Sequence, residues 1–346
     1  MTERVVVSDP GAWDAFVLGN GGHPLQLWGW GELKSRHRWS AQRVLVREGG
    51  RVVGGASVLL RRLPGGIGRL AYVPRGPVLA DDGGADAERL VAGALAEHVR
   101  ASAPGAVALM LEPDAERFET GPGWRPSPEH VLPARTLILD LARPEEELLS
   151  AMAKKTRQYV RKSGGEDLEI RPVVTRDQLE ACLAVYRETA DRADFGLHEH
   201  GYYVDAFELL GEHGRIWASY RGEDPVAFLW LGVSARTAFE LYGGMNAEGQ
   251  RLRANYALKW HAIRAMREAG VARYDFGGLI NDGVTTFKKG FASHEDLLAG
   301  SVDRPLSWRY PLYARALPLG KRAVRALARA RRRDGSRGEP APGTRQ

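Results

Sequence analysis

The sequence predicts a duplicated α/β fold, and a repeat in the order of its elements is the main evidence. Residues 43–112 are expected to form strand, strand, strand, helix and strand, and residues 215–276 repeat this order at an offset of about 172 residues. Such a repeat indicates an internal duplication. The chain of 346 residues is long enough for two domains, and 44% of its residues are hydrophobic, which is enough to fill two cores. We therefore expect two similar α/β domains.

The first half begins with an expected strand at residues 4–7 and a helix at 9–18, followed by an aromatic-rich helical segment at 25–36. A Glu-Gly-Gly turn at residues 48–50 predicts a hairpin. A third strand ends at Pro74-Arg75-Gly76-Pro77. The two prolines make this corner rigid and hold Arg75 in one direction. An amphipathic helix and a buried strand that ends at Glu112 complete the unit.

The second half begins with an expected strand at residues 135–141 and a long helix that starts at Pro144 and ends at Gly164-Gly165. Its first turn is acidic and its end is basic, which suits the helix dipole. The basic residues at its end could follow a phosphate backbone, or they could only be solvated; they are Lys154, Lys155, Arg157, Arg161 and Lys162. Thr175 and Gln178 have the spacing of a capping box and predict a further helix. The hairpin, third strand, helix and strand of the repeat follow.

The stretch Gly270–Phe291 has the composition of an anion-binding element. A short strand leads into Gly277-Gly278, where the backbone can adopt conformations that other residues avoid. Lys288 and Lys289 then lie between Phe287 and Phe291. Sites in two-domain proteins gather between the domains and at strand ends. We therefore expect Glu112 and Lys288 to approach one cleft, although a plain loop with solvated lysines would give the same spacing.

Composition excludes several classes of protein. The single cysteine, Cys182, rules out an internal disulfide and a thiolate-rich metal site. The histidines show no zinc-binding spacing, so we expect no metal. No apolar run is long enough to span a membrane, and the charged N-terminus lacks a signal-peptide core, so a cytoplasmic location is expected.

The net charge of +6 is concentrated at the end of the chain. Residues 321–346 contain nine basic and two acidic residues and carry +7, so the rest of the chain sums to −1. Residues 321–333 are expected to form a basic helix, and the composition of residues 334–346 is typical of disorder. The tail could bind a polyanion or an anionic membrane, or it could only keep the protein soluble.

Five motifs together resemble the Fem (FemA/FemB/FemX) family of aminoacyltransferases. They are LQLWGWGELK (25–34), YVPRGP (72–77), KKTR (154–157), YDFGG (274–278) and FKKGF (287–291). The resemblance covers about Leu25 to Leu317. It implies two tandem GNAT-like domains with mixed sheets flanked by helices. Because residues 190–214 contain no heptad run, the coiled-coil insertion of some relatives is expected to be absent.

The resemblance also implies a domain division and a reaction. Residues 1–133 with 306–333 would form the first domain, which the C-terminal helix completes, and residues 134–305 would form the second. The implied reaction moves an amino acid from aminoacyl-tRNA to an amine in the stem peptide of a peptidoglycan precursor. No cofactor is implied, and we expect a monomer.

The implied roles fall on named residues. Lys288 would act at the reacting ester and Glu112 near the acceptor amine. Substrate-binding roles fall on Lys34, Trp30, Arg75, His198, Tyr202, Tyr242 and Phe287, and tRNA-binding roles on Lys289, Lys154, Lys155, Arg157 and Arg161. One position departs from the family pattern, because His198 stands where an arginine is expected.

The chemistry of ester aminolysis fits these residues, and three rival functions stay open. An ester is already activated, so positioning of the amine and compensation of negative charge are the main demands. His198 leaves room for a small natural-product amine as acceptor. A CoA-dependent N-acetyltransferase would need a glycine-rich phosphate turn, but Arg253 occupies the place of a glycine. A non-catalytic protein that binds RNA or membrane through its tail is the third alternative.

Overall fold

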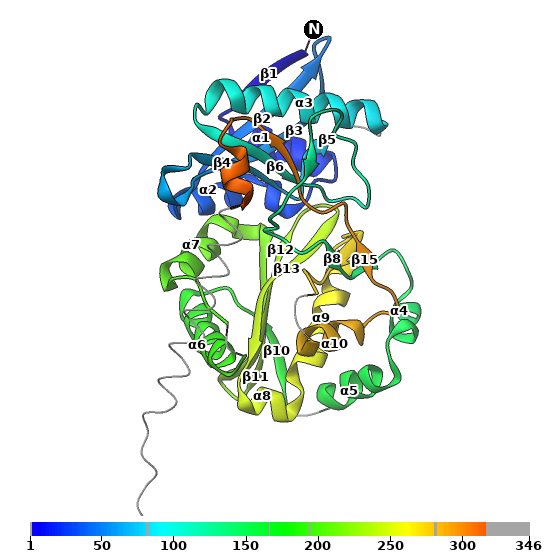
Figure 1. Cartoon of the computed structure of the whole chain (residues 1–346). Helices are drawn as coiled ribbons and strands as arrows, with labels where there is room; N and C mark the ends of the chain where they lie inside the picture. Colours follow the sequence, from blue (N-terminus) through cyan, green and yellow to red (C-terminus); the bar gives the residue numbers. More distant parts are fainter. Residues whose placement is uncertain (1, 81–82, 166, 194, 280–281, 316–346) are drawn as a thin grey trace, which may run out of the picture.

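The computed structural model describes residues 2–80, 83–165, 167–193, 195–279 and 282–315. Two mixed sheets form its framework, with the first sheet above the second in Figure 1. The predicted helix at 321–333 and the predicted disordered tail lie outside the described residues. Within those residues, no helix has the length and apolar character needed to cross a bilayer.

The first sheet has the strand order β1-β2-β3-β4-β6-β16-β7, and β5 pairs with β3. The strands are β1 (Thr2–Val7), β2 (Ser40–Glu48), β3 (Arg51–Arg62), β4 (Arg69–Pro74), β5 (Val78–Leu79), β6 (Ala106–Glu112), β7 (Arg125–Pro126) and β16 (Val302–Pro305). The associated helices are α1 (Pro10–Gly19), η1 (Pro24–Gln26), α2 (Trp28–Arg36), η2 (Pro64–Gly66) and α3 (Gly84–Ser102).

The second sheet has the strand order β10-β11-β12-β13-β14-β9. The strands are β9 (Ile138–Asp140), β10 (Glu169–Pro172), β11 (Gly214–Arg221), β12 (Asp224–Val233), β13 (Thr237–Met245) and β14 (Arg273–Asp275), and β8 (Arg135–Thr136) pairs separately with β15 (Asp296–Leu297). The helices are α4 (Glu145–Ala151), α5 (Lys154–Gly164), α6 (Arg176–Ala193), α7 (His200–Leu210), η3 (Gly211–His213), α8 (Ala247–Leu252), α9 (Ala254–Glu268) and α10 (Asp282–Lys289).

The predicted duplication is confirmed. In the first half β2, β3 and β4 are antiparallel neighbours, and α3 leads to β6, which is parallel to β4. In the second half β11, β12 and β13 repeat this pattern, and α9 leads to β14, which is parallel to β13. Between α6 and β11 the described residues form α7 and η3.

Each face of the second sheet has its own hydrophobic core. Helices α6 and α7 cover one face, while α4, α5, α9 and α10 lie on the other (Figure 1). Cys182 is fully buried in the α6–α7 core, and burial raises its thiol pKa to about 12. The two faces matter for function because predicted site residues lie on both.

The prediction of one long helix from Pro144 to Gly164 is wrong. Met152 and Ala153 adopt extended ψ values of 150° and 142°, so the segment forms two helices, α4 and α5. The break places the Ala153 amide 2.9 Å from the Gly290 carbonyl oxygen, after α10, and buries Met152. Lys154 and Lys155 therefore lie at the start of α5, where the helix dipole disfavours positive charge.

The capping-box prediction is confirmed at the start of α6. The Gln178 side-chain oxygen accepts from the amides of Val174 and Thr175 at 2.8 and 3.1 Å, and the Gln178 amide donates to the Thr175 hydroxyl. Helix α6 runs to Ala193.

Near its end the described chain returns to the first sheet. Strand β16 pairs with β6 from Val302 onward, and Tyr310 and Tyr313 pack with Leu63 and Leu70 of the first half. The division into domains at residues 133/134 and 305/306 stays a prediction.

Candidate functional site

Five predicted substrate-binding residues meet where α2 packs against α7. We call this group the Lys34 cluster; it consists of Trp30, Lys34, His198, Tyr202 and Tyr242. The Lys34 ammonium donates to the Tyr202 hydroxyl at 2.7 Å and lies 4.4 Å from the Trp30 ring centroid. The Tyr242 hydroxyl donates to the Tyr202 hydroxyl at 3.2 Å, and His198 stacks on the Tyr202 ring at 4.0 Å.

Two local features of the sequence make this meeting possible. At Gly29 a Cβ would collide with the Leu209 carbonyl oxygen of α7, so glycine allows the two helices to approach closely. In β13 a bulge occurs where Trp230 pairs with Tyr242 but Leu231 pairs with Glu240. The bulge interrupts the alternation of side chains along the strand. Tyr242 therefore packs in the α6–α7 core, while Glu240 contacts Lys259 of α9 on the other face.

The Lys34 cluster is cationic, and in the described part of the chain no carboxylate pairs with Lys34. Burial lowers the pKa of the Lys34 ammonium to about 8. The pKa of His198 is lowered by burial first and then by the positive charges of Lys34 and His37. Burial raises the pKa of Tyr202 to about 12 and that of Tyr242 well above its usual value, so both hydroxyls stay protonated. The arrangement offers hydrogen-bond donors and a desolvated cation to an anion.

Lys288 lies on the opposite face of the second sheet, at the end of α10. Its ammonium donates to the carbonyl oxygens of Phe276 at 2.6 Å, Gly277, and Gly278 at 2.9 Å. All three N–H groups of the ammonium are used by these bonds. Burial lowers the pKa of Lys288 to about 8. In this arrangement Lys288 holds the Gly277-Gly278 turn, where both residues have positive φ, 60° and 47°.

A buried ion pair beside Lys288 was missed by the sequence reasoning. Lys259 of α9 pairs with Glu240, and their side chains are only 7% and 9% exposed. The Tyr274 hydroxyl donates to the same carboxylate at 2.8 Å. Phe287 packs beside this group against Tyr256, with ring centroids 5.0 Å apart. Glu240 in an otherwise apolar strand was the available signal.

Glu112 is buried at the end of β6, and its carboxylate is fully engaged. It accepts from the Tyr72 hydroxyl, the Ser301 hydroxyl at 2.6 Å and the amides of Val131 and Leu132 at 2.7 and 3.1 Å. These bonds tie the end of β6 to the segment that leads into the second sheet. They orient the carboxylate firmly.

Arg75 links this region to Lys288. It has φ 48°, is 2% exposed and donates to the Pro133 carbonyl oxygen at 2.9 Å. The Pro133 ring lies directly against Gly278, where a Cβ would meet it at 2.6 Å. Contacts therefore run from Glu112 through residues 131–133 to Gly278 and Lys288. The expectation that Glu112 and Lys288 approach one cleft stays a prediction.

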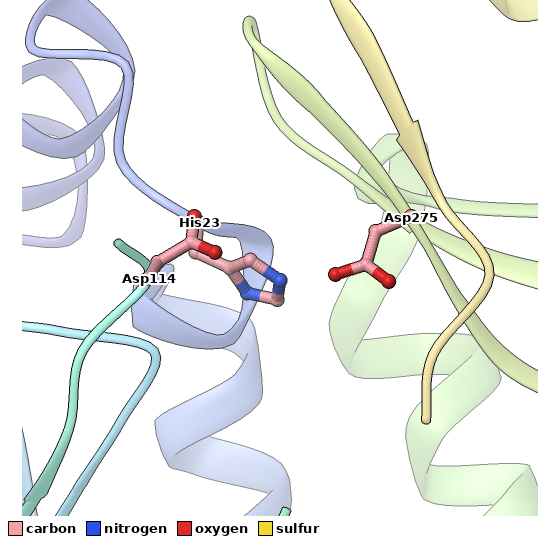
Figure 2. Close-up of side chains that lie close together, drawn as sticks. All are labelled: His23, Asp114 and Asp275. Atoms are coloured by element: carbon pink, nitrogen blue, oxygen red, sulfur yellow. The ribbon is translucent and has the colours of Figure 1, made fainter. Parts of the chain in front are cut away.

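A second buried group lies between the sheets, and no motif in the sequence predicted it. His23, Asp114 and Asp275 converge so that one ligand atom of each lies within 4.8 Å of the others (Figure 2). His23 Nε2, one oxygen of Asp114 and one of Asp275 are buried without a hydrogen-bond partner. Arg273 pairs with the other oxygen of Asp114. Asp114 follows β6 and Asp275 is the last residue of β14. Both therefore lie at strand ends, where sites are common.

The tautomer of His23 argues against a metal at this group. Its Nδ1 accepts a hydrogen bond from the Leu25 amide at 3.1 Å. The neutral ring must then carry its proton on Nε2. Burial, followed by the charges of Arg75 and Arg273, holds the pKa of His23 well below its usual range, so the ring is neutral. An Nε2–H group facing two carboxylates is a hydrogen-bond donor and cannot ligate a metal.

The predicted tRNA-binding residues lie on the α5–α10 side of the second sheet and differ in availability. Lys154, Lys155 and Arg161 are exposed on α5. Arg157 donates to the carbonyl oxygens of Ser150 at 2.9 Å and Met152 at 2.5 Å, and Lys289 pairs with Glu295. The roles of all five residues stay predictions.

Known proteins resemble the chain in a domain family, in sequence and in fold. A GNAT acetyltransferase domain family matches residues 150–289. The lipid II:glycine glycyltransferase of Staphylococcus aureus (strain MRSA252) is 22% identical over 87% of this chain and 92% of its own length. Its counterpart from Staphylococcus haemolyticus (strain JCSC1435) is 26% identical over 58% of this chain and 51% of its own length.

Two solved structures share the fold. The crystal structure of FemX superposes with a TM-score of 0.77 at 19% identity and covers 90% of this chain and 98% of that one. A tandem GNAT protein from the clavulanic acid biosynthesis pathway superposes with a TM-score of 0.52 at 14% identity, covering 89% of this chain and 99% of that one. The repeated β-sheet units, the named relatives and the FemX fold agree: the chain is an acyltransferase built from two tandem GNAT-like domains, and it is similar to the Fem proteins in sequence and fold.

Proposed function

We propose that the protein transfers an amino acid from aminoacyl-tRNA to an amine in the stem peptide of a peptidoglycan precursor, and so builds interpeptide bridges. The observation that carries this proposal is the Lys34 cluster. It contains a desolvated lysine that has no carboxylate partner among the described residues and is surrounded by aromatic rings and hydroxyls. A diphosphate on a lipid-linked or nucleotide-linked precursor is a ligand of matching charge. The relatives named lipid II:glycine glycyltransferase support the same class of acceptor.

The proposed step is aminolysis of an ester. The amine nitrogen attacks the ester carbonyl carbon and forms a tetrahedral intermediate. The carbon–oxygen bond to the ribose then breaks, the oxygen leaves with the electron pair, and the proton lost by the amine ends on that oxygen or in solvent. Negative charge on the intermediate must be compensated. In this proposal, Lys288 gives up one of its bonds to a backbone carbonyl and donates to the negative oxygen of the intermediate instead. Alternatively, it keeps these bonds and holds the Gly277-Gly278 turn, whose groups line the site.

Glu112 and Arg75 are proposed to act on the acceptor side. Glu112 is positioned by four donors and could orient the attacking ammonium and accept its proton. Arg75 is proposed as a phosphate contact, since its planar fork suits phosphate oxygens. It would have to exchange its bond to the Pro133 carbonyl for that contact.

The aminoacyl-tRNA donor is proposed to bind over α5, and the basic tail is proposed to contact the membrane. The exposed cations Lys154, Lys155 and Arg161 suit a phosphate backbone, where binding falls steeply with salt. The basic tail, residues 321–346, could hold a monomeric protein at the inner face of the plasma membrane. A cytoplasmic location belongs to this proposal because aminoacyl-tRNA is found there.

Other acceptors and donors are less well supported. A small natural-product amine is favoured only by His198, which replaces the expected arginine. CoA is disfavoured in the first half because β4 and β6 pair along Arg69–Pro74 and leave no gap between them. In the second half Arg253 has φ 55° at the start of α9, and its guanidinium lies 4.5 Å over the Tyr159 ring instead of leaving a glycine-lined cradle. A protein that only binds RNA or membrane does not require the Lys34 cluster.

The test is a product assay with defined donors. The enzyme is incubated with charged tRNA or acetyl-CoA and a peptidoglycan precursor, and the product is weighed. An increase by one amino-acid residue, dependent on intact RNA, supports the proposal. An acetylated product or an RNA-independent one would overturn it.

A further inference from the structure

The first domain contains a pocket walled by arginines that the proposed reaction does not use. We call it the arginine pocket. It has a volume of about 540 Å³, and its cationic wall consists of Arg38, Arg61, Arg62 and Arg69. Trp39 and the apolar residues Leu60, Leu63 and Pro64 form the rest of the wall, together with Ser40. Among the residues that the structure describes, no acidic side chain lines this pocket.

The four arginines come from different segments and stay unpaired. Arg38 follows α2, Arg61 and Arg62 end β3, and Arg69 begins β4. Arg38 has φ 66°, a conformation that is costly for a residue with a side chain. In the part of the chain that the structure describes, none of the four forms an ion pair, whereas many other arginines do. Like charges gathered without counter-charges repel one another, and a bound anion would relieve this repulsion.

The neighbouring C-terminal segment indicates which anion. Tyr310 and Tyr313 pack with Leu63, Leu70 and Trp39, so residues 307–315 lie beside the arginine pocket. The side of this segment turned away from the core carries Trp308, 84% exposed, and Leu312, 53% exposed. An exposed tryptophan and leucine next to arginines are typical of a surface that inserts shallowly into a bilayer. The sequence that follows carries +7 over residues 321–346.

We propose that the arginine pocket binds the phosphate group of an anionic phospholipid, with Trp308 and Leu312 entering the interface of the bilayer. A nucleic acid is less suitable because Arg61 lies 5.5 Å over the Trp39 ring and competes with a base for that face. The pocket also combines apolar and cationic walls, as a phosphate joined to acyl chains requires. This proposal is independent of which amine the enzyme acylates.

The test compares two variants of the full-length chain that have the same net charge. The pocket variant carries Arg38→Gln, Arg61→Gln, Arg62→Gln and Arg69→Gln. The control variant carries Arg51→Gln, Arg117→Gln, Arg187→Gln and Arg215→Gln, four exposed arginines outside the pocket. Both variants keep the basic tail. Co-sedimentation is measured with vesicles of phosphatidylglycerol and phosphatidylcholine, and with phosphatidylcholine alone.

The pocket variant is expected to bind the anionic vesicles at least about ten-fold more weakly than the natural protein, because each basic group at the surface contributes several-fold. The control variant is expected to change by about two-fold or less. Equal binding of the two variants would overturn the proposal, and loss of tRNA binding with unchanged vesicle binding would reassign the pocket to nucleic acid.

A second measurement stays informative if the pocket variant folds poorly. Brominated lipids are expected to quench part of the tryptophan fluorescence of the natural protein, and Trp308→Phe is expected to remove that part. Quenching that is identical in Trp308→Phe would contradict insertion of this segment. Turnover of a water-soluble precursor is expected to be normal in Trp308→Phe, which separates failure of this proposal from failure of the proposed reaction.

Discussion

Replacement of Lys34 by methionine tests the acceptor site most sharply. Methionine keeps much of the apolar stem but removes the ammonium that donates to Tyr202. The lowering of the Lys34 pKa from 10.5 to about 8 by burial corresponds to roughly 3 kcal/mol of desolvation cost. A bound phosphate would recover much of this cost. A charge-assisted hydrogen bond contributes about 1.5–3 kcal/mol, so we expect KM for the precursor to rise about 10- to 150-fold in Lys34→Met.

The same variant should leave kcat nearly unchanged, because Lys34 and Lys288 lie on opposite faces of the second sheet. Initial rates over a range of precursor concentrations separate the two constants. Arg51→Met, at an exposed hairpin position of the first sheet, is the matched control. An unchanged KM, or a loss confined to kcat, would refute the assignment of Lys34 to precursor binding.

Four further predictions follow from the geometry. Lys288→Ala should slow transfer about 100- to 1000-fold. It should also lower the free energy of unfolding by about 1–3 kcal/mol, because the carbonyls of residues 276–278 lose their donor. Single-turnover rates and urea melts measure the two effects, and turnover equal to that of the natural protein would contradict the role of Lys288. Lys34 is charged below its pKa of about 8, so precursor affinity in binding titrations should hold below pH 7 and fall as the pH rises through 8; a flat profile would count against this. His198→Arg should lower KM about ten-fold, since arginine stays charged where the neutral histidine does not; an increase in KM would indicate that His198 contacts a different acceptor. Dialysis against EDTA followed by metal analysis should find no tightly bound metal, because His23 Nε2 carries a proton; a stoichiometric metal would contradict this tautomer.

The repeat in the order of elements was sufficient to predict the two sheets. Strands β11, β12, β13 and β14 repeat β2, β3, β4 and β6 in order and direction, because hairpin turns and apolar periodicity are local signals. The five motifs correctly predicted the similarity to the Fem proteins. Members of two motifs are connected in the structure: Arg75 at the rigid corner contacts Pro133, which lies against Gly278 of the YDFGG turn.

The features that the sequence could not reveal depend on tertiary contacts. The break at Met152-Ala153 depends on a hydrogen bond to Gly290, which is far away in the sequence. The bulge in β13 sends Glu240 and Tyr242 to opposite faces, although strict alternation would place them together. The His23, Asp114 and Asp275 group combines residues from three distant segments. None of these has a local pattern that distinguishes it from an ordinary loop or strand.

The most direct measurement of the central proposal is the mass of the product made from total charged tRNA and a peptidoglycan precursor. The proposal predicts a product heavier by one amino-acid residue, attached at an amine of the stem peptide, and no such product when the donor is treated with RNase beforehand. A product of the same mass after RNase treatment, or an acetylated product when acetyl-CoA is the only donor, would contradict it.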